Sequence, residues 1–230
     1  LELDAIRASL EQRVIERTRL LETSAEVSRR LSTILDPQQL VKEVVDEVQR
    51  SFGYYHAHIY LLDESNEVLR MVGGTGEAGR IMLESGHRIG IGKGLVGRTA
   101  QIKQAVLVSD TLADSGWLPN PLLPETCSEV AVPIMIGERV LGVLDVQQNR
   151  VNGLSSQDSE LLQSIANQLA IALQNAQQIE SAQRLTARSI RSDLIVRQIQ
   201  ETHTVREALQ VAVRELGRML DIPKAQVNLD

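Results

Sequence analysis

Apolar residues recur at every second position along Ser128–Gln147, and this is the clearest structural pattern in the chain. The positions that recur with a period of two are Val130, Val132, Ile134 and Ile136, then Val140, Gly142, Leu144 and Val146. Gly137 separates the two runs. Two such runs around a short glycine turn predict a β-hairpin, and because few charges interrupt them, we expect both of its faces to be covered. Pro133 has no backbone N–H, so we expect a free side or an irregularity beside it.

Apolar residues recur with helical spacing at both ends of the chain. Residues 1–35 contain no glycine or proline, and their charges are mixed. A stripe of this length favours a parallel two-stranded coiled coil, although a helix folded back on its own domain is the alternative. A second helix is predicted from Ser155 to about Thr202. The residues expected to form a dimer interface are Leu3, Ile6, Leu10, Leu20, Val27, Leu31, Ile165, Leu169, Ala172, Ala176 and Ile179.

Shorter elements are predicted between these helices. Asp36-Pro37 caps a helix over 38–52, which Gly53 ends. Strands follow over 54–62 and 67–72, and the glycines at 73–76 open a connection. A short helix over 95–101 and a short strand over 105–108 precede an irregular stretch over 109–127. Long loops of this kind are usually functional or disordered.

The glycines Gly92, Gly94 and Gly97 form a G-x-G-x-x-G pattern. Such a pattern cradles a phosphate when it follows a hydrophobic strand inside a βαβ unit. No such strand precedes it here, and Gly94 stands where a nucleotide-binding loop needs Ser or Thr. We therefore interpret these glycines as a tight turn into the short helix, required for positive φ and close backbone packing.

The hairpin and the helix after it carry a family resemblance. SEVAVPIMIGERVLGVLDVQ, followed by NRVNGLSSQDSELLQSIANQLAIALQNA, resembles the closing half of a GAF domain of bacterial multidomain signalling proteins. The resemblance implies an α/β (α+β) fold, with a GAF/PAS-like antiparallel sheet, helices on it and long flanking coiled-coil helices. We expect a coiled-coil helix over 1–35, the GAF domain over 36–180 and a connecting helix over 181–203.

The last residues repeat the first packing helix of that domain. A shift of 168 residues places Val41 on Leu209, Val45 on Val213 and Ile59 on Val227. We therefore expect 204–230 to be a helix and a strand resembling the start of a second GAF unit, either truncated or a half-module. A helix and strand alone cannot bury their apolar face.

The resemblance also indicates candidate ligand-binding residues. In GAF domains the irregular stretch lies over the pocket, so Trp117 either caps a ligand or fills the cavity. The candidates are Tyr60, Trp117, Cys127, Ser128 and Glu129. Some relatives hold haem through a histidine, and His87 is the position to check. His56 and His58 share one strand face, but no third metal ligand is near, so no metal is predicted. No cofactor is identified.

The composition argues against some classes of function. The net charge of −6 argues against nucleic acid, and no apolar run is long enough for a membrane span. The single cysteine fits a reducing cytoplasm. We predict no enzyme activity: a cytoplasmic, homodimeric sensor binds an unknown small molecule and relays occupancy through its flanking helices to an output domain outside these residues. The alternatives are a ligand-free structural GAF dimeriser and, more weakly, a thiol-dependent enzyme using Cys127.

Overall fold

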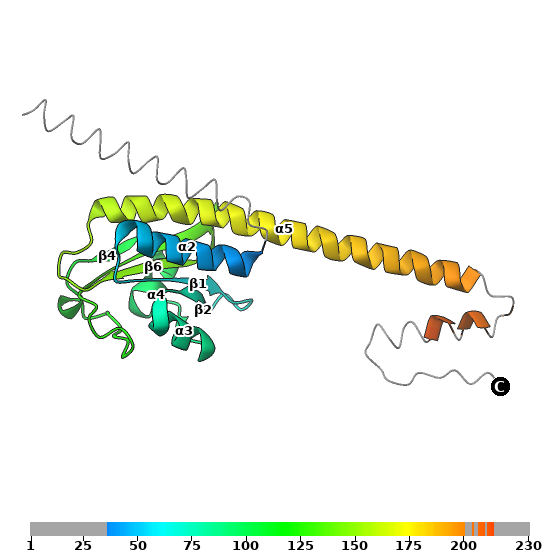
Figure 1. The fold of residues 1–230 in the computed structure, drawn as a ribbon, viewed down its shortest axis with the longest axis horizontal. Coiled ribbons are helices and arrows are strands. Elements are labelled where there is room, and N and C mark those ends of the chain that lie inside the picture. Colours follow the sequence, from blue (N-terminus) through cyan, green and yellow to red (C-terminus); the bar gives the residue numbers. More distant parts are fainter. Residues whose placement is uncertain (1–35, 201–203, 205–206, 210, 214–230) are drawn as a thin grey trace, which may run out of the picture. The chain divides into compact units, whose positions relative to one another are not determined.

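A computed structural model describes residues 36–200, 204, 207–209 and 211–213. The chain divides into two units, Leu1–Ala176 and Gln177–Asp230. The first unit contains a six-stranded antiparallel sheet of order β3-β2-β1-β6-β5-β4 (Figure 1). Its strands are β1 (His56–Leu62), β2 (Val68–Gly74), β3 (Arg88–Gly90), β4 (Val106–Val108), β5 (Ser128–Ile136) and β6 (Arg139–Gln148). The predicted hairpin is therefore confirmed as β5 and β6, in the centre of a mixed α/β fold.

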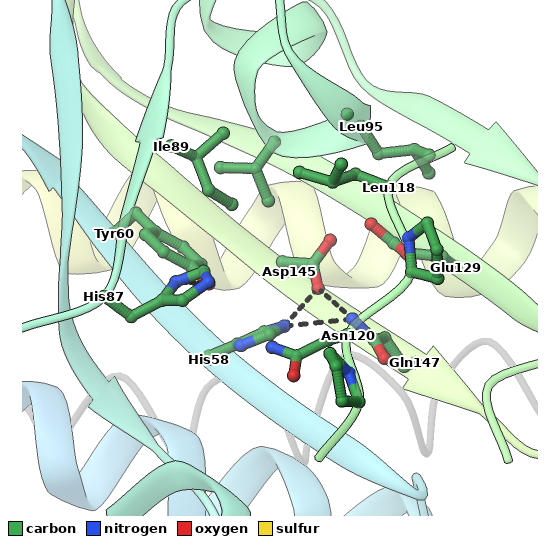
Figure 2. A pocket seen from close by; sticks show the side chains of 14 residues that line it. His58, Tyr60, His87, Ile89, Leu95, Leu118, Asn120, Glu129, Asp145 and Gln147 are labelled. Atoms are coloured by element: carbon green, nitrogen blue, oxygen red, sulfur yellow. Dashed lines mark hydrogen bonds and ion pairs between the residues drawn. The ribbon is translucent and has the colours of Figure 1, made fainter. Parts of the chain in front are cut away.

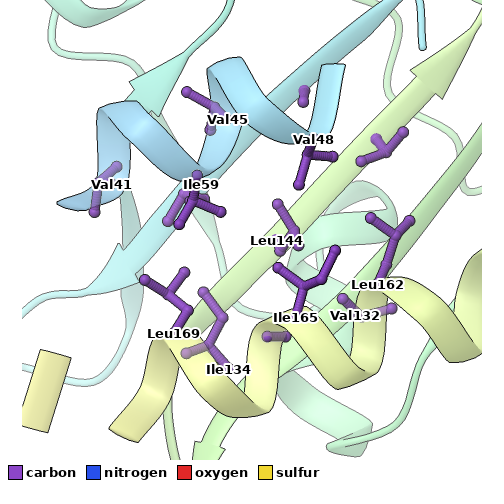
Figure 3. Packing of buried hydrophobic residues seen from close by; sticks show 14 of the residues in the cluster. Val41, Val45, Val48, Ile59, Val132, Ile134, Leu144, Leu162, Ile165 and Leu169 are labelled. Atoms are coloured by element: carbon purple, nitrogen blue, oxygen red, sulfur yellow. The ribbon is translucent and has the colours of Figure 1, made fainter. Parts of the chain in front are cut away.

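One face of the sheet is covered by two helices, α2 (Pro37–Phe52) and the first part of α5 (Ser156–Gln200). Figure 3 shows aliphatic side chains of both helices meeting those of β1, β5 and β6. Val44, Ile59 and Leu144 are among the residues with no exposed surface. Since almost all of these side chains are aliphatic, burial of apolar area is the main stabilising force on this face.

The other face carries α3 (Gly76–Glu84), α4 (Gly94–Ile102) and the segment over 109–127, which includes the 3-10 turn η1 (Thr111–Ala113). A smaller apolar cluster, with Met82, Leu95 and Val143, lies here. Sequence analysis predicted α4 but described the chain after Gly73 only as a connection, and so missed α3. The glycine motif forms the expected turn: a Cβ on Gly97 would lie 2.3 Å from the carbonyl oxygen of Gly90, so no larger residue fits.

An irregularity in β6 determines which residues share a face. The β5–β6 register shifts opposite Ile134 and Met135, where Leu141 of β6 has no partner. The irregularity expected beside Pro133 thus lies in the neighbouring strand, and Pro133 itself pairs with Val143. Beyond the shift, Glu129 pairs with Gln147 and Ala131 with Asp145. Without the extra residue, Glu129 would oppose Val146, and Asp145 would face the aliphatic layer, because directly paired residues share a face. The bulge therefore places Asp145 on the same face as Glu129.

The structure corrects the interpretation of the apolar stripe on α5. Ile165, Leu169, Ala172 and Ala176 lie in the core of their own chain, at 8% exposure or less. Their side chains pack on the sheet, so they are not available to a partner helix. Ile179 is 38% exposed. The other residues of the expected interface, Leu3 to Leu31, lie outside the described residues, as do most of 204–230. The long flanking coiled coil is therefore not supported.

Candidate functional site

A pocket of about 190 Å³ lies on the face of the sheet that carries α3 and α4 (Figure 2). Strands β1, β5 and β6 supply its floor, α4 and the residues around His87 supply walls, and the segment 118–121 crosses it. The lining residues are His58, Tyr60, His87, Ile89, Gly94, Leu95, Val96, Leu118, Pro119, Asn120, Pro121, Glu129, Asp145 and Gln147. Polar side chains thus lie on the floor, and several of the wall residues are apolar.

Asp145 is the centre of the polar floor. It has no exposed surface, and its Oδ2 lies 2.5 Å from Nε2 of His58. Gln147 donates to the same oxygen over 3.2 Å. The other oxygen, Oδ1, is buried, and no nitrogen or hydroxyl group of the described residues donates to it. Asp145 does share a side-chain hydrogen bond with Glu129, which forms when one of the two carboxyl groups is protonated. A ligand N–H that reached this pair would meet two carboxyl groups with a single negative charge.

Burial controls the charge of this group. It raises the pKa of Asp145 to about 7 and, together with the nearby His87, lowers the pKa of His58 to about 3. Near neutral pH His58 is therefore uncharged and keeps one ring N–H, while Asp145 is partly ionised. When the carboxyl proton leaves, Nε2–H of His58 can donate to Oδ2, and the pair carries one negative charge inside the protein, where a cation would stabilise it.

Glu129 lies next to Asp145 and is 5% exposed. Its Oε2 accepts a hydrogen bond from the indole Nε1 of Trp117 over 2.8 Å. Burial, followed by the charge of Asp145, raises its pKa well above the ordinary value. Two buried carboxyl groups side by side do not both ionise near neutral pH. The floor of the pocket therefore offers one negative charge and room for a single positive one.

The opposite end of the floor is aromatic. Tyr60 is buried, and its hydroxyl lies 3.2 Å from Nδ1 of His87. His87 is half-buried, and desolvation lowers its pKa. Figure 2 shows these two side chains on the far side of Asp145 from Glu129. At neutral pH His87 is uncharged, so this end supplies hydrogen-bonding groups rather than a second charge.

The structure brings two of the five predicted ligand-binding residues together. Tyr60 and Glu129 line the pocket, whereas Trp117 holds Glu129 from outside it. Ser128 does not line the pocket, and its hydroxyl donates to the carbonyl of Arg150 over 3.0 Å. Cys127 does not line it either, and its Sγ lies 3.4 Å from the carbonyl oxygen of Glu125. These three residues are therefore not ligand contacts in this arrangement.

Sequence reasoning missed the residues that matter most. His58 was considered only as a possible metal ligand, but it is 3% exposed and lines the pocket, and Asp145 and Gln147 were not singled out. The available signal was a set of polar residues at alternate positions of otherwise apolar strands. His87 lines the pocket, but haem is far larger than a pocket of this size. Across the described residues, no three His, Cys, Asp or Glu side chains are placed to hold a metal ion.

Several solved structures share the fold. The X-ray structure of free methionine-R-sulfoxide reductase from Neisseria meningitidis, in complex with its substrate, matches with a TM-score of 0.62 and 20% identity over 70% of this chain and 91% of that one. The GAF domain of a phosphoenolpyruvate-protein phosphotransferase from Acinetobacter matches with a TM-score of 0.60 and 24% identity, over 69% and 95%. The corresponding domain from Coxiella burnetii gives a TM-score of 0.64 and 16% identity, over 70% and 96%. Comparison with curated proteins gives no match.

These structures correct one prediction. Sequence analysis predicted no enzyme activity, but free methionine-R-sulfoxide reductases are enzymes and have the same fold as this chain. The fold therefore does not exclude catalysis, and the prediction as made is wrong. At these identities the likeness establishes the fold alone.

The family itself follows from the sequence match. The family model described as "GAF domain" matches residues 34–174, which is more than half of the chain and includes every residue that lines the pocket. In the described part of the chain, none of the helices is both long enough and apolar enough for a membrane span. GAF domains are commonly sensory or regulatory. This chain belongs to the GAF domain family.

Proposed function

We propose that this GAF domain binds a small molecule with one positively charged, hydrogen-bond-donating group, and that the group lies against Asp145. The observation that supports this most is the buried pair of carboxyl groups, Asp145 and Glu129, in the floor of an open pocket. A ligand N–H would donate a hydrogen bond to this pair, and its positive charge would offset the negative charge of the ionised carboxylate.

The pocket limits the size and shape of the ligand. A dry cavity of about 150 Å³ accommodates benzene, so about 190 Å³ suits a molecule somewhat larger than that. The side chains of Ile89, Leu95 and Leu118 would contact an apolar part of the ligand. A primary amine with a short aliphatic chain, either alone or as part of an amino acid, has both features.

The pocket also bears on the choice between sensor and empty structural domain. Sequence analysis expected that Trp117 would fill the cavity in an empty domain. Trp117 instead lies outside the lining and donates to Glu129, and the pocket is open. This supports ligand binding over a purely structural role.

A binding experiment tests the proposal. Isothermal titration calorimetry with n-butylamine and the standard amino acids should detect an amine that binds at pH 8. Its affinity should fall by up to tenfold per pH unit below about 7, because protonated Asp145 must lose its proton before it can pair with a cation. The variant D145N, which cannot ionise, should lose at least tenfold in affinity at pH 8.

Two controls sharpen this test. Tetramethylammonium has the charge but no N–H, so it should bind more weakly than the amine. The substitution E138Q, at a side chain that is 97% exposed in the turn between β5 and β6 and outside the pocket lining, should leave the affinity unchanged. Binding that persists equally in D145N, or that does not depend on pH between 5 and 8, would contradict the proposal.

We further propose that occupancy is relayed through α5. Strand β6 carries Asp145 toward the pocket and Leu144 toward α5, so a shift of β6 on binding would act on the helix packing. Homodimerisation, the output domain and the signalling context remain predictions. Analytical ultracentrifugation at several protein concentrations tests the dimer.

A further inference from the structure

The two oxygens of Asp145 differ in their surroundings, and this difference depends on residues that do not touch the expected ligand position. Oδ2 has two partners, Nε2 of His58 at 2.5 Å and Nε2 of Gln147 at 3.2 Å. Oδ1 receives none from a nitrogen or hydroxyl group of the described residues, and the carboxyl group of Glu129 is hydrogen-bonded to Asp145. The nitrogen donors therefore act on Oδ2 alone, and they fix the orientation of the Asp145 carboxyl group.

The orientation of the Gln147 amide is set from outside the pocket. Oε1 of Gln147 lies 2.5 Å from the hydroxyl of Thr126, a buried residue that does not line the pocket. That hydroxyl has one hydrogen and two acceptors within reach, Oε1 and the carbonyl of Leu123 at 3.0 Å. The shorter contact takes the hydrogen. The Thr126 hydroxyl then donates to Oε1, which turns the NH₂ group of Gln147 toward Asp145 and His58.

Thr126 is itself held in place. Its carbonyl accepts from the hydroxyl of Thr111 over 3.0 Å, and the backbone N–H of Thr111 donates to the carbonyl of Cys127 over 2.9 Å. Both threonines belong to the irregular segment 109–127. The same segment contains Trp117, whose indole N–H donates to Glu129. The chain of contacts thus runs from this segment through Gln147 to the carboxyl group.

We infer that Thr126 is a positioning residue of the binding site: its hydroxyl orients the Gln147 amide, which with His58 holds Oδ2 of Asp145 and so fixes the orientation of the carboxyl group that a ligand would meet. The ligand chemistry rests on the proposed function, but the orientation of the amide does not. If the hydroxyl is lost, the amide can turn over and present its oxygen to Asp145, and two acceptors would then face each other. Such an arrangement favours a protonated Asp145, which donates to that oxygen.

The charged and titratable groups around Asp145 define how this can be measured. They are His58 and Tyr60 from β1, His87 before β3, Glu129 from β5 and Arg98 from α4, whose charge acts on Glu129. Donation from Gln147 lowers the pKa of Asp145 against the larger effect of burial. A reversed amide should therefore raise this pKa in the free protein, whether or not any ligand binds.

The test uses the variant T126V, which has nearly the shape of threonine, with T126S as the matched control that keeps the hydroxyl. Carbon-13 NMR of the Asp carboxyl groups follows the titration of Asp145, assigned by its absence in D145N. We expect the pKa of Asp145 to rise by about one unit in T126V and to stay unchanged in T126S. Affinity for n-butylamine should then fall in T126V only, by about twofold at pH 8 and about fivefold at pH 7, because less of Asp145 is ionised.

The outcomes separate this inference from the proposed function. If no amine binds the wild type but the pKa rises in T126V alone, the positioning role stands and the ligand proposal fails. If the pKa is unchanged or lower in a folded T126V, the amide is not oriented by Thr126 and the inference is overturned. A loss of affinity shared equally by T126S, or without any change in pKa, overturns it as well. Amide-proton spectra of each variant establish that it is folded.

Discussion

The two faces of the sheet are built from the same strands but have different contents. On the face under α2 and α5, adjacent strands contribute Ile59, Leu144 and Val132, all without exposed surface. On the other face the same strands contribute His58, Asp145 and Gln147, which are also buried. Burial of polar groups without full pairing costs free energy, whereas burial of aliphatic groups provides it. The aliphatic face stabilises the fold, and the polar face carries a site that is costly without a ligand.

The largest expected effect is on the aliphatic face. The substitution L144A removes a fully buried side chain from between the two helices and the sheet. We expect the free energy of unfolding to fall by about 2–5 kcal/mol, because the cavity left behind adds to the lost transfer free energy. Urea denaturation measures this change. As a control, I171A, at a side chain of α5 that is 56% exposed, should change it by less than about 0.5 kcal/mol. Similar losses in both variants would contradict the burial of Leu144.

The next residue in the chain should behave in the opposite way. In the unfolded chain the pKa of Asp145 is near 3.8, but in the folded protein burial raises this pKa to about 7. Unfolding thus becomes easier as the pH rises between these two values, and the effect levels off above about 7. The substitution D145N removes the cost of ionising a buried carboxyl group. We therefore expect it to stabilise the protein at pH 8 by on the order of a few kcal/mol, and by less at pH 5.

Thermal unfolding of both proteins at several pH values measures this. The difference in melting temperature between D145N and the wild type should grow from pH 5 to pH 7 and then stay constant. A difference that shrinks as the pH rises would mean that Asp145 is stabilised as a carboxylate and that the polar face is not under-paired. Together, L144A and D145N would show that two neighbours on β6 have opposite effects on stability because they point to opposite faces.

The sequence could predict the aliphatic face because its pattern is local. Alternation in the hairpin and the spacing in α2 identify almost every side chain of that layer. The polar face needs the register as well, and this depends on one extra residue in β6, Leu141. Counting back from the turn without the bulge places Glu129 opposite Val146, so the Glu129–Asp145 pair could not be derived. Nor could burial of His58, since a strand histidine is as often exposed. The stripe on α5 was read correctly as apolar but assigned to a partner, because periodicity does not tell which surface covers it.

The smallest of these effects tests a polar contact at the edge of the aliphatic face. The hydroxyl of Tyr54 donates to Oδ1 of Asp158 over 2.7 Å, and Oδ2 of Asp158 accepts from Ser155 at the start of α5. The substitution Y54F removes only the hydroxyl, so we expect a loss of about 1 kcal/mol in the free energy of unfolding. Urea denaturation at pH 6 and pH 8 measures it. The loss should be the same at both, because burial and Asp158 hold the pKa of Tyr54 above its ordinary value of 10 and keep the hydroxyl protonated. A loss in Y54F that varies with pH in this range would mean that a group on the aliphatic face also titrates, and the contrast between the two faces would then be weaker than their side chains indicate.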